Sequence, residues 1–148
     1  MKLKFTYLML LVIVFATACT KSKTAADLNP TSPSGTYAGQ FRLIHIHKDN
    51  TKDTLKANIL LTMSLTTGFK VTGDTATVHA GSYGSYIIGL SGSNTITFVD
   101  KTYPTTGTPT KTHLNGQYNY YYDGTVLQMQ AFGPLDTLAL QYDLKRSN

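Results

Sequence analysis

Apolar and polar residues alternate with a period of two from Gly35 to Lys145, and this alternation predicts β-strands with one buried and one solvated face. The segment from Leu55 to Leu65 has an apolar residue at every second position and shows the pattern most clearly. The predicted strands cover residues 37–47, 55–65, 69–73, 82–90, 95–99, 113–122, 125–132 and 138–144, and a further short strand is predicted over residues 75–80. We expect no helix in this part of the chain.

Short polar turns connect most of these segments, so successive strands are expected to pair antiparallel. Residues 48–53 form one such turn, and Asp123 and Gly124 stand between two alternating runs, which is a strong signal for a tight hairpin. The connections are too short for crossovers between parallel strands. About eight antiparallel strands, with glycines that bend the segment 82–90, predict an all-β fold that closes as an up-and-down barrel. A two-sheet β-sandwich is the alternative.

The N-terminal residues have a different pattern, which is typical of a secretory signal peptide. Two lysines lie within the first four residues, and an apolar run over residues 5–15 follows them. The run is too short to cross a bilayer as a helix. The small residues Ala16, Thr17 and Ala18 come next, and Cys19, the only cysteine in the chain, follows them directly.

This arrangement of Ala16, Thr17, Ala18 and Cys19 resembles the lipobox of bacterial lipoproteins. The resemblance implies that residues 1–18 are a signal peptide that is removed, and that Cys19 becomes a lipidated N-terminus. The protein would then be attached to a membrane through its lipid. Because the only cysteine is used in this way, the domain would be stable without a disulfide.

The segment between the cysteine and the first strand is expected to be a flexible linker. Residues 19–34 contain two prolines and almost no large apolar side chain, so they cannot form a packed core. A coil of this length reaches about 20 Å on average. Thr20 stands where an aspartate marks some lipoproteins for the inner membrane, and the resemblance therefore implies the outer membrane of a Gram-negative cell envelope. Residues 35–148 form the remaining domain.

The composition gives no support for binding to nucleic acid. The formal charge of the whole chain is +5, and it falls to +3 once the two lysines of the signal peptide are removed. The chain has no basic stripe of the kind that binds nucleic acid. All eight acidic residues are aspartates, and residues that favour helices are few beside Thr, Gly, Ser and Tyr, which supports the all-β prediction.

The predicted domain also resembles the lipocalin-like, or calycin, class of small meander barrels. Gly35, Thr36 and Tyr37 stand where lipocalins carry Gly-x-Trp at the start of their first strand, with tyrosine in place of tryptophan. The resemblance implies a barrel that binds a small apolar ligand or lipid. It also implies that Arg146, the only late arginine, packs on the aromatic residue of this tripeptide.

The tyrosines are the candidate ligand-facing residues. Tyr118, Tyr120 and Tyr122 share one face of a predicted strand, and Tyr142 occupies an apolar position near the end of the chain. If this face points inward, the phenols line either a cavity with a few polar groups or a packed core. A hollow barrel would bind a small apolar ligand. A filled one would instead be an envelope module that binds a protein or a glycan, including proteins of the inhibitor type.

His45 and His47 are candidates for a metal site. They share one face of the first predicted strand, and His79 or His113 could complete a tetrahedral zinc site with them. The other interpretation is a solvated rim. The chain has no Gly-x-Ser-x-Gly nucleophile motif, so we predict a protein without enzymatic activity or a cofactor, a hydrolase built on the histidines being the remaining alternative. The sequence leaves the oligomeric state open.

Overall fold

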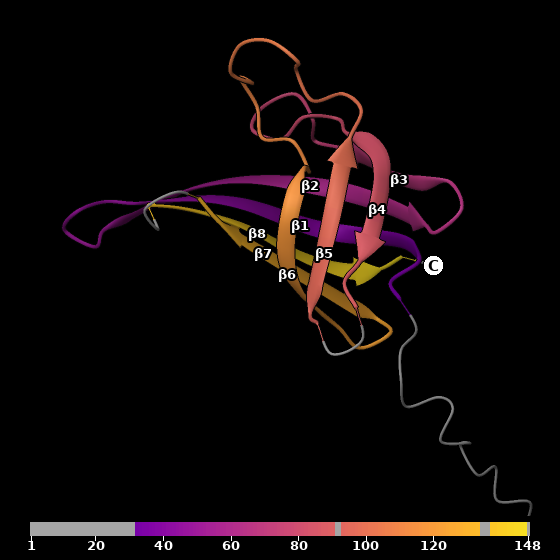
Figure 1. Cartoon of the computed structure of the whole chain (residues 1–148). Helices are drawn as coiled ribbons and strands as arrows, with labels where there is room; N and C mark the ends of the chain where they lie inside the picture. Colours follow the sequence, from indigo (N-terminus) through magenta and orange to yellow (C-terminus); the bar gives the residue numbers. More distant parts are fainter. Residues whose placement is uncertain (1–31, 91–92, 134–136, 148) are drawn as a thin grey trace, which may run out of the picture.

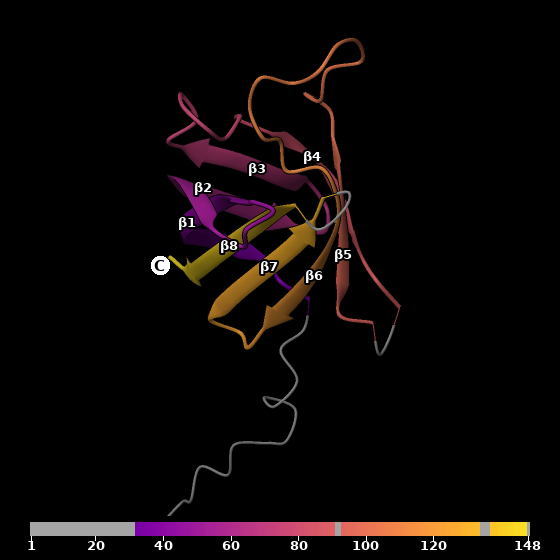
Figure 2. The same ribbon diagram turned by 90° about the vertical axis from the view of Figure 1, so that its left-hand side faces the viewer.

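The computed structural model describes residues 32–90, 93–133 and 137–147, which form a closed eight-stranded antiparallel barrel (Figures 1 and 2). Each strand pairs with the next one along the chain, and the last pairs with the first. The strands are β1 (Gly35–Ile46), β2 (Lys52–Ser64), β3 (Gly68–Gly73), β4 (Tyr83–Ile88), β5 (Thr95–Asp100), β6 (Gly116–Tyr122), β7 (Val126–Phe132) and β8 (Leu138–Arg146). The predicted all-β up-and-down barrel is confirmed, and the structure is not the alternative sandwich. The predicted signal peptide, Cys19 and all but the end of the linker lie outside the described residues.

One short segment was predicted wrongly. Residues 75–80 form a turn instead of a strand, because side chains and backbone satisfy one another locally. The Thr75 amide donates to the Gly73 carbonyl at 2.9 Å, and the Thr77 hydroxyl donates to the Asp74 carboxylate at 3.3 Å. Only His79 forms a bridge, which is isolated and parallel, to Thr112. Within the described ranges, no helix is long and apolar enough to span a membrane.

The junction between β1 and β8 closes the barrel. Tyr37 pairs with Arg146 at one end of this junction, and His45 pairs with Leu138 at the other. Gly39 lies in this junction, and a Cβ atom built on it would be 2.1 Å from the Asp143 carbonyl oxygen. The absence of a side chain at this position therefore permits the closure.

Aromatic rings fill the interior of the barrel. Phe41 lies against Tyr142 with ring centroids 4.9 Å apart, Tyr142 against Tyr118 at 5.6 Å, and Tyr118 against Phe98 at 5.9 Å. Phe69 packs on Phe98 at 5.0 Å. These separations are those of favourable edge-to-face and tilted pairs. Aliphatic side chains occupy the remaining inward positions, namely Ala57, Ile59, Leu61, Met63, Val71, Ile96, Leu127, Met129 and Leu144.

Arg146 seals the end of the barrel where the chain enters. Its guanidinium carbon lies 5.5 Å from the centre of the Tyr37 ring, which is cation–π distance, so the packing implied by the lipocalin resemblance is confirmed. Arg146 Nη2 also donates to the Ser34 carbonyl at 2.6 Å and to the Tyr122 hydroxyl at 2.8 Å. The start of β1 is thereby tied to β6 and β8.

The opposite end is closed by two loop segments, residues 77–82 and 111–115, which we call the plug. The Ala80 amide donates to the Thr112 carbonyl at 2.8 Å, and the Thr112 amide donates to the Val78 carbonyl at 2.9 Å. His79 and Leu114, one from each segment, are fully buried on top of the aromatic core. Each end of the interior is therefore covered by the chain itself.

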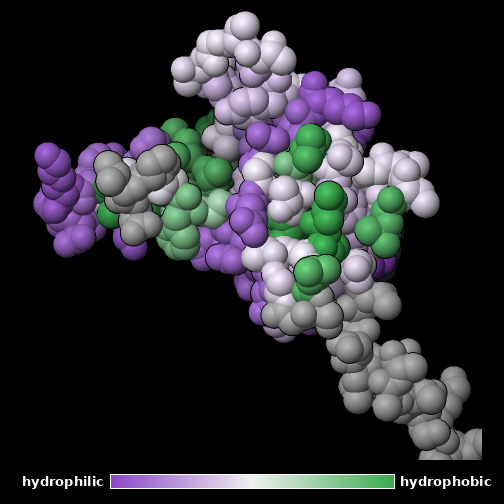
Figure 3. Space-filling view, viewed as in Figure 1, coloured by the Kyte–Doolittle hydropathy of each residue, from purple (hydrophilic) through white to green (hydrophobic). Residues whose placement is uncertain are grey.

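The outer surface differs from one side of the barrel to another. At and next to β4 and β5 it exposes the apolar side chains of Ile87, Leu90 and Val99. Figure 3 shows hydrophobic side chains gathered over these two strands. The outward positions of β6, β7 and β8 carry mostly amides and other polar groups instead. The two faces therefore differ in polarity.

Candidate functional site

The tyrosines predicted to face a ligand do point into the barrel. Tyr118 and Tyr142 are fully buried, and Tyr120 and Tyr122 are partly buried against the same core. Their rings take part in the aromatic packing, so they fill the interior. Contact between these four residues and a ligand stays a prediction.

A buried hydrogen-bonded chain links this core to the plug. His79 Nδ1 donates to the Ala80 carbonyl at 2.6 Å, which leaves Nε2 to accept from the Tyr142 hydroxyl at 2.9 Å. Burial lowers the pKa of His79 to about 4, and it raises the pKa of Tyr118 to about 12. The Tyr118 hydroxyl is buried and makes no hydrogen bond to another described residue. All three side chains are therefore neutral at pH 7.

Above the plug, the barrel opens into a cavity of about 490 Å³, which we call the mouth pocket. One wall is a strip of leucines across three strands: Leu55 on β2 pairs with Leu43 on β1, which pairs with Leu140 on β8. Leu138 and Val78 extend this wall. The strip continues the inward face of the strands beyond the filled core, because side chains two residues apart share a face.

The facing wall of the mouth pocket is polar and comes from the plug and the loop before it. Tyr103, Lys111 and His113 line it. Lys111 Nζ donates to the Thr75 carbonyl at 2.9 Å, so this side chain ties the segment 111–115 to the turn that precedes the other plug segment. His45 stands at the edge, on the β1 side. The pocket thus combines an apolar wall with several groups that can donate hydrogen bonds.

Asp100 fixes the orientation of His113 in this wall. The Asp100 carboxylate is fully buried and lies 2.7 Å from His113 Nδ1. Burial alone would raise the pKa of Asp100, but hydrogen bonds from the Thr102 hydroxyl and amide and from His113 hold it below its ordinary value. The ionised carboxylate therefore holds the proton on Nδ1 of His113, and Nε2 is left for a further partner.

Of the two histidines proposed as metal ligands, His45 lines the mouth pocket together with His113, whereas His47 does not line it. His47 Nε2 lies 2.8 Å from the Asp53 carboxylate on the exposed hairpin between β1 and β2. His79 has partners on both ring nitrogens, and His113 is held by Asp100. In the part of the chain that the structure describes, no three His, Cys, Asp or Glu residues are grouped to hold a metal ion.

The fold and these features define a class: a small closed meander barrel with a packed interior and an amphipathic pocket at one mouth. The comparisons with protein-family models, with curated proteins and with solved structures each found no match. The function must therefore be inferred from the geometry of this chain alone.

The mouth pocket was not predicted from the sequence. Leu43, Leu55 and Leu140 belong to the alternating pattern, but the pattern does not distinguish a core position from one just beyond the core. His113 and Asp100 flank a long loop, and only the fold brings them together. The feature of the sequence that could have indicated a site here is the length of the loop over residues 101–115, because long ordered loops often carry function.

Proposed function

We propose that this protein is a lipid-anchored protein of the bacterial cell envelope that binds a small amphipathic molecule in the mouth pocket. The observation that carries the proposal is the pairing of a leucine wall with a wall of hydrogen-bond donors in one cavity of about 490 Å³. Pockets of this size, mostly apolar and with a few convergent polar groups, are typical of small-molecule sites in the mouths of barrels.

The mouth pocket is a better candidate for the ligand-binding site than the interior of the barrel. Tyr118, Tyr142 and Phe41 occupy the axis of the barrel, and a ligand there would have to displace packed rings. Above the plug, Leu55 is already half exposed, so covering it gains free energy without any rearrangement of the core. The ligand therefore lies on the barrel, with its apolar body against the leucine strip.

The head group of the ligand is expected to be an acceptor, such as a carboxylate or phosphate. Lys111 is a cation that can donate to such a head group, whereas His113, with its proton held on Nδ1 by Asp100, presents Nε2 as a hydrogen-bond acceptor. The Asp100 carboxylate is buried behind His113 and is satisfied by its own hydrogen bonds, so Lys111 is the charge in this wall that an anionic head group would meet. Fatty acids have this combination of an apolar body and an anionic head.

The mouth pocket lies at the end of the barrel opposite to the one where the chain enters, as is suitable for a protein anchored through its N-terminus. The chain enters the barrel at the end sealed by Arg146, whereas Leu43 and His45 lie toward the far end of β1. Attachment through Cys19 would therefore leave the mouth pocket facing away from the anchor. A ligand could reach it from solution.

Titration with a fluorescent fatty acid, together with native mass spectrometry, tests the ligand proposal. Leu55→Asp is expected to weaken binding about tenfold or more, because it removes part of the apolar wall and adds a negative charge near the head group. Leu65→Asp is the matched control: Leu65 is also exposed, 66% against 50%, but does not line the pocket. We expect it to bind as the wild type does. An unsaturable signal with wild-type protein, or equal losses in both variants, would contradict the proposal.

The anchor requires a separate experiment. Cells that express the full chain are grown with a clickable fatty-acid analogue, and the expected result is a labelled protein in the membrane fraction. Cys19→Ala should abolish the label, because this residue is the only cysteine in the chain. A wild-type protein without label would disprove the lipid anchor and leave the ligand experiment unaffected.

A further inference from the structure

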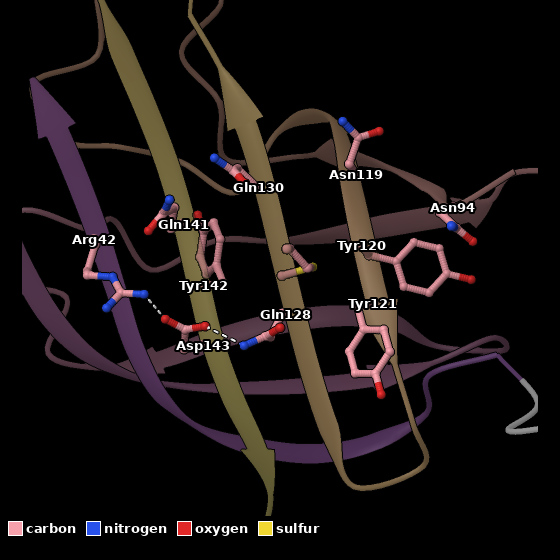
Figure 4. A pocket seen from close by; sticks show the side chains of 11 residues that line it. Arg42, Asn94, Asn119, Tyr120, Tyr121, Gln128, Gln130, Gln141, Tyr142 and Asp143 are labelled. Atoms are coloured by element: carbon pink, nitrogen blue, oxygen red, sulfur yellow. Dashed lines mark hydrogen bonds and ion pairs between the residues drawn. The ribbon is translucent and has the colours of Figure 1, made fainter. Parts of the chain in front are cut away.

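A second concave surface lies on the outside of the barrel, across β1, β8, β7 and β6. It encloses about 610 Å³, and we call it the amide groove (Figure 4). Two rows of side chains cross it at right angles to the strands, as the strand register requires. The first row is Arg42, Gln141, Gln130 and Asn119, and the second is Asp143, Gln128 and Tyr121.

The groove is polar but carries no net charge from its two ionised residues. Arg42 forms an ion pair with Asp143, and Gln128 Nε2 donates to the other oxygen of the same carboxylate at 3.0 Å. This cluster fixes one end of the groove. Because the two charges neutralise each other, the surface has little attraction for an anion such as a nucleotide or an acidic polymer.

The remaining carboxamides are available to a ligand. Gln130, Gln141 and Asn119 make no side-chain hydrogen bond to any other residue within the described ranges. Each carries an acceptor oxygen and two N–H donors. They project from adjacent strands, which are 4.7–4.9 Å apart in any sheet, so the groove repeats the same donor and acceptor pair at a regular spacing.

An exposed aromatic ring ends the second row. Tyr121 is 58% exposed and points outward, whereas its neighbours Tyr120 and Tyr122 turn toward the core. Figure 4 shows the Tyr121 ring beside the groove, on the strand farthest from Arg42. An exposed flat ring next to hydrogen-bonding groups offers a stacking surface for a ligand with an apolar face.

We propose that the amide groove binds a neutral oligosaccharide. Each sugar hydroxyl donates and accepts hydrogen bonds, as a carboxamide does, and the C–H face of a pyranose ring stacks on an aromatic ring. A polymer of sugars repeats its hydroxyls, which matches the repeated amides. This proposal is independent of the mouth pocket, which lies at one end of the barrel and shares no lining residue with the groove.

An extended peptide would be the other ligand with repeated donors and acceptors. Peptides that add to a sheet pair with the backbone of an edge strand, but a closed barrel has no edge strand to offer. The groove also lacks a row of apolar subsites for peptide side chains, since most of its lining residues are polar. These features favour the sugar.

Affinity electrophoresis in gels that contain a soluble polysaccharide tests the proposal. The probes are the neutral polymers laminarin, dextran, galactomannan and arabinoxylan, together with the acidic polymer polygalacturonate. We expect at least one neutral polymer to retard the wild-type protein. Tyr121→Ala should raise the dissociation constant about tenfold by removing the stacking surface. Gln130→Leu should weaken binding as well, since it removes an amide and keeps the shape.

Tyr83→Ala is the matched control. Tyr83 is 52% exposed on β4, outside the groove, so this variant should be retarded as strongly as the wild type. Thermal melts of the three variants exclude misfolding as the cause of a loss. The proposal is overturned if no neutral polymer retards the protein, if polygalacturonate alone does, or if Tyr83→Ala loses as much binding as Tyr121→Ala. Selection of peptides from a displayed library that require Tyr121 would assign the groove to a peptide instead.

Discussion

Replacement of Gly39 by alanine is expected to destabilise the barrel by about 3 kcal/mol or more, because the closure between β1 and β8 leaves no space for a side chain. The new Cβ atom would lie 2.1 Å from the Asp143 carbonyl oxygen and 2.9 Å from the Leu144 Cα atom. Both are backbone atoms, so no side-chain movement relieves the overlap. Urea unfolding followed by circular dichroism measures the change.

Gly81→Ala provides the control for this experiment. Its nearest neighbours, in Thr75 and Val71, are 3.8 Å from the position of the added Cβ, which is ordinary van der Waals contact. Its stability should stay within about 1 kcal/mol of the wild type. A Gly39→Ala protein as stable as Gly81→Ala would mean that β1 and β8 do not approach as closely as described.

Acidification is expected to remove about 3 kcal/mol of stability between pH 6.5 and pH 4 through His79 alone. In the unfolded chain this histidine takes up a proton near its ordinary pKa of 6.5, whereas desolvation in the folded protein lowers its pKa to about 4. In this range the unfolded state therefore binds more protons. The free energy of unfolding is highest above pH 6.5 and decreases as the pH falls.

The variant His79→Gln isolates this contribution. Glutamine can accept from Tyr142 and donate to the Ala80 carbonyl, but it does not titrate. Asp100 and His113, which also act on the pKa of His79, are retained in the variant and should contribute to both proteins alike. The wild type should thus lose about 3 kcal/mol more than His79→Gln across the range. If the free energy of unfolding changed with pH in the same way in the wild type and in His79→Gln, His79 would not be kept neutral by burial.

The strands could be predicted because each is determined by residues that are close together in the sequence. Period-two alternation located all eight of them, and Asp123 with Gly124 located one hairpin turn. The choice between barrel and sandwich could not be made in the same way, because it depends on pairing between residues such as Tyr37 and Arg146, 109 positions apart. Residues 75–80 were assigned wrongly because the turn formed by Asp74 and Thr77 overrode a short alternating pattern.

The sites were less predictable than the fold. Alternation placed Tyr118, Tyr120 and Tyr122 on one face, and the structure turns this face inward. Whether such a face encloses a cavity depends on the summed volume of the side chains from all the strands. The position of His79 depends on Tyr142, which is 63 residues away. In the amide groove, residues such as Gln128 and Gln130 are visible as outward positions in the sequence, but a polar outward residue is also the ordinary state of a protein surface.

The pairing of β1 with β8 also sets the order of events during biogenesis. The barrel cannot close until Leu138 to Arg146, which form the last strand in chain order, are available to β1. A nascent or partly translocated chain is therefore expected to remain open, with both β1 and β7 lacking a neighbour. Under the proposed export this delay would be an advantage, since a chain that cannot complete its fold early stays competent for passage across a membrane as an unfolded polypeptide.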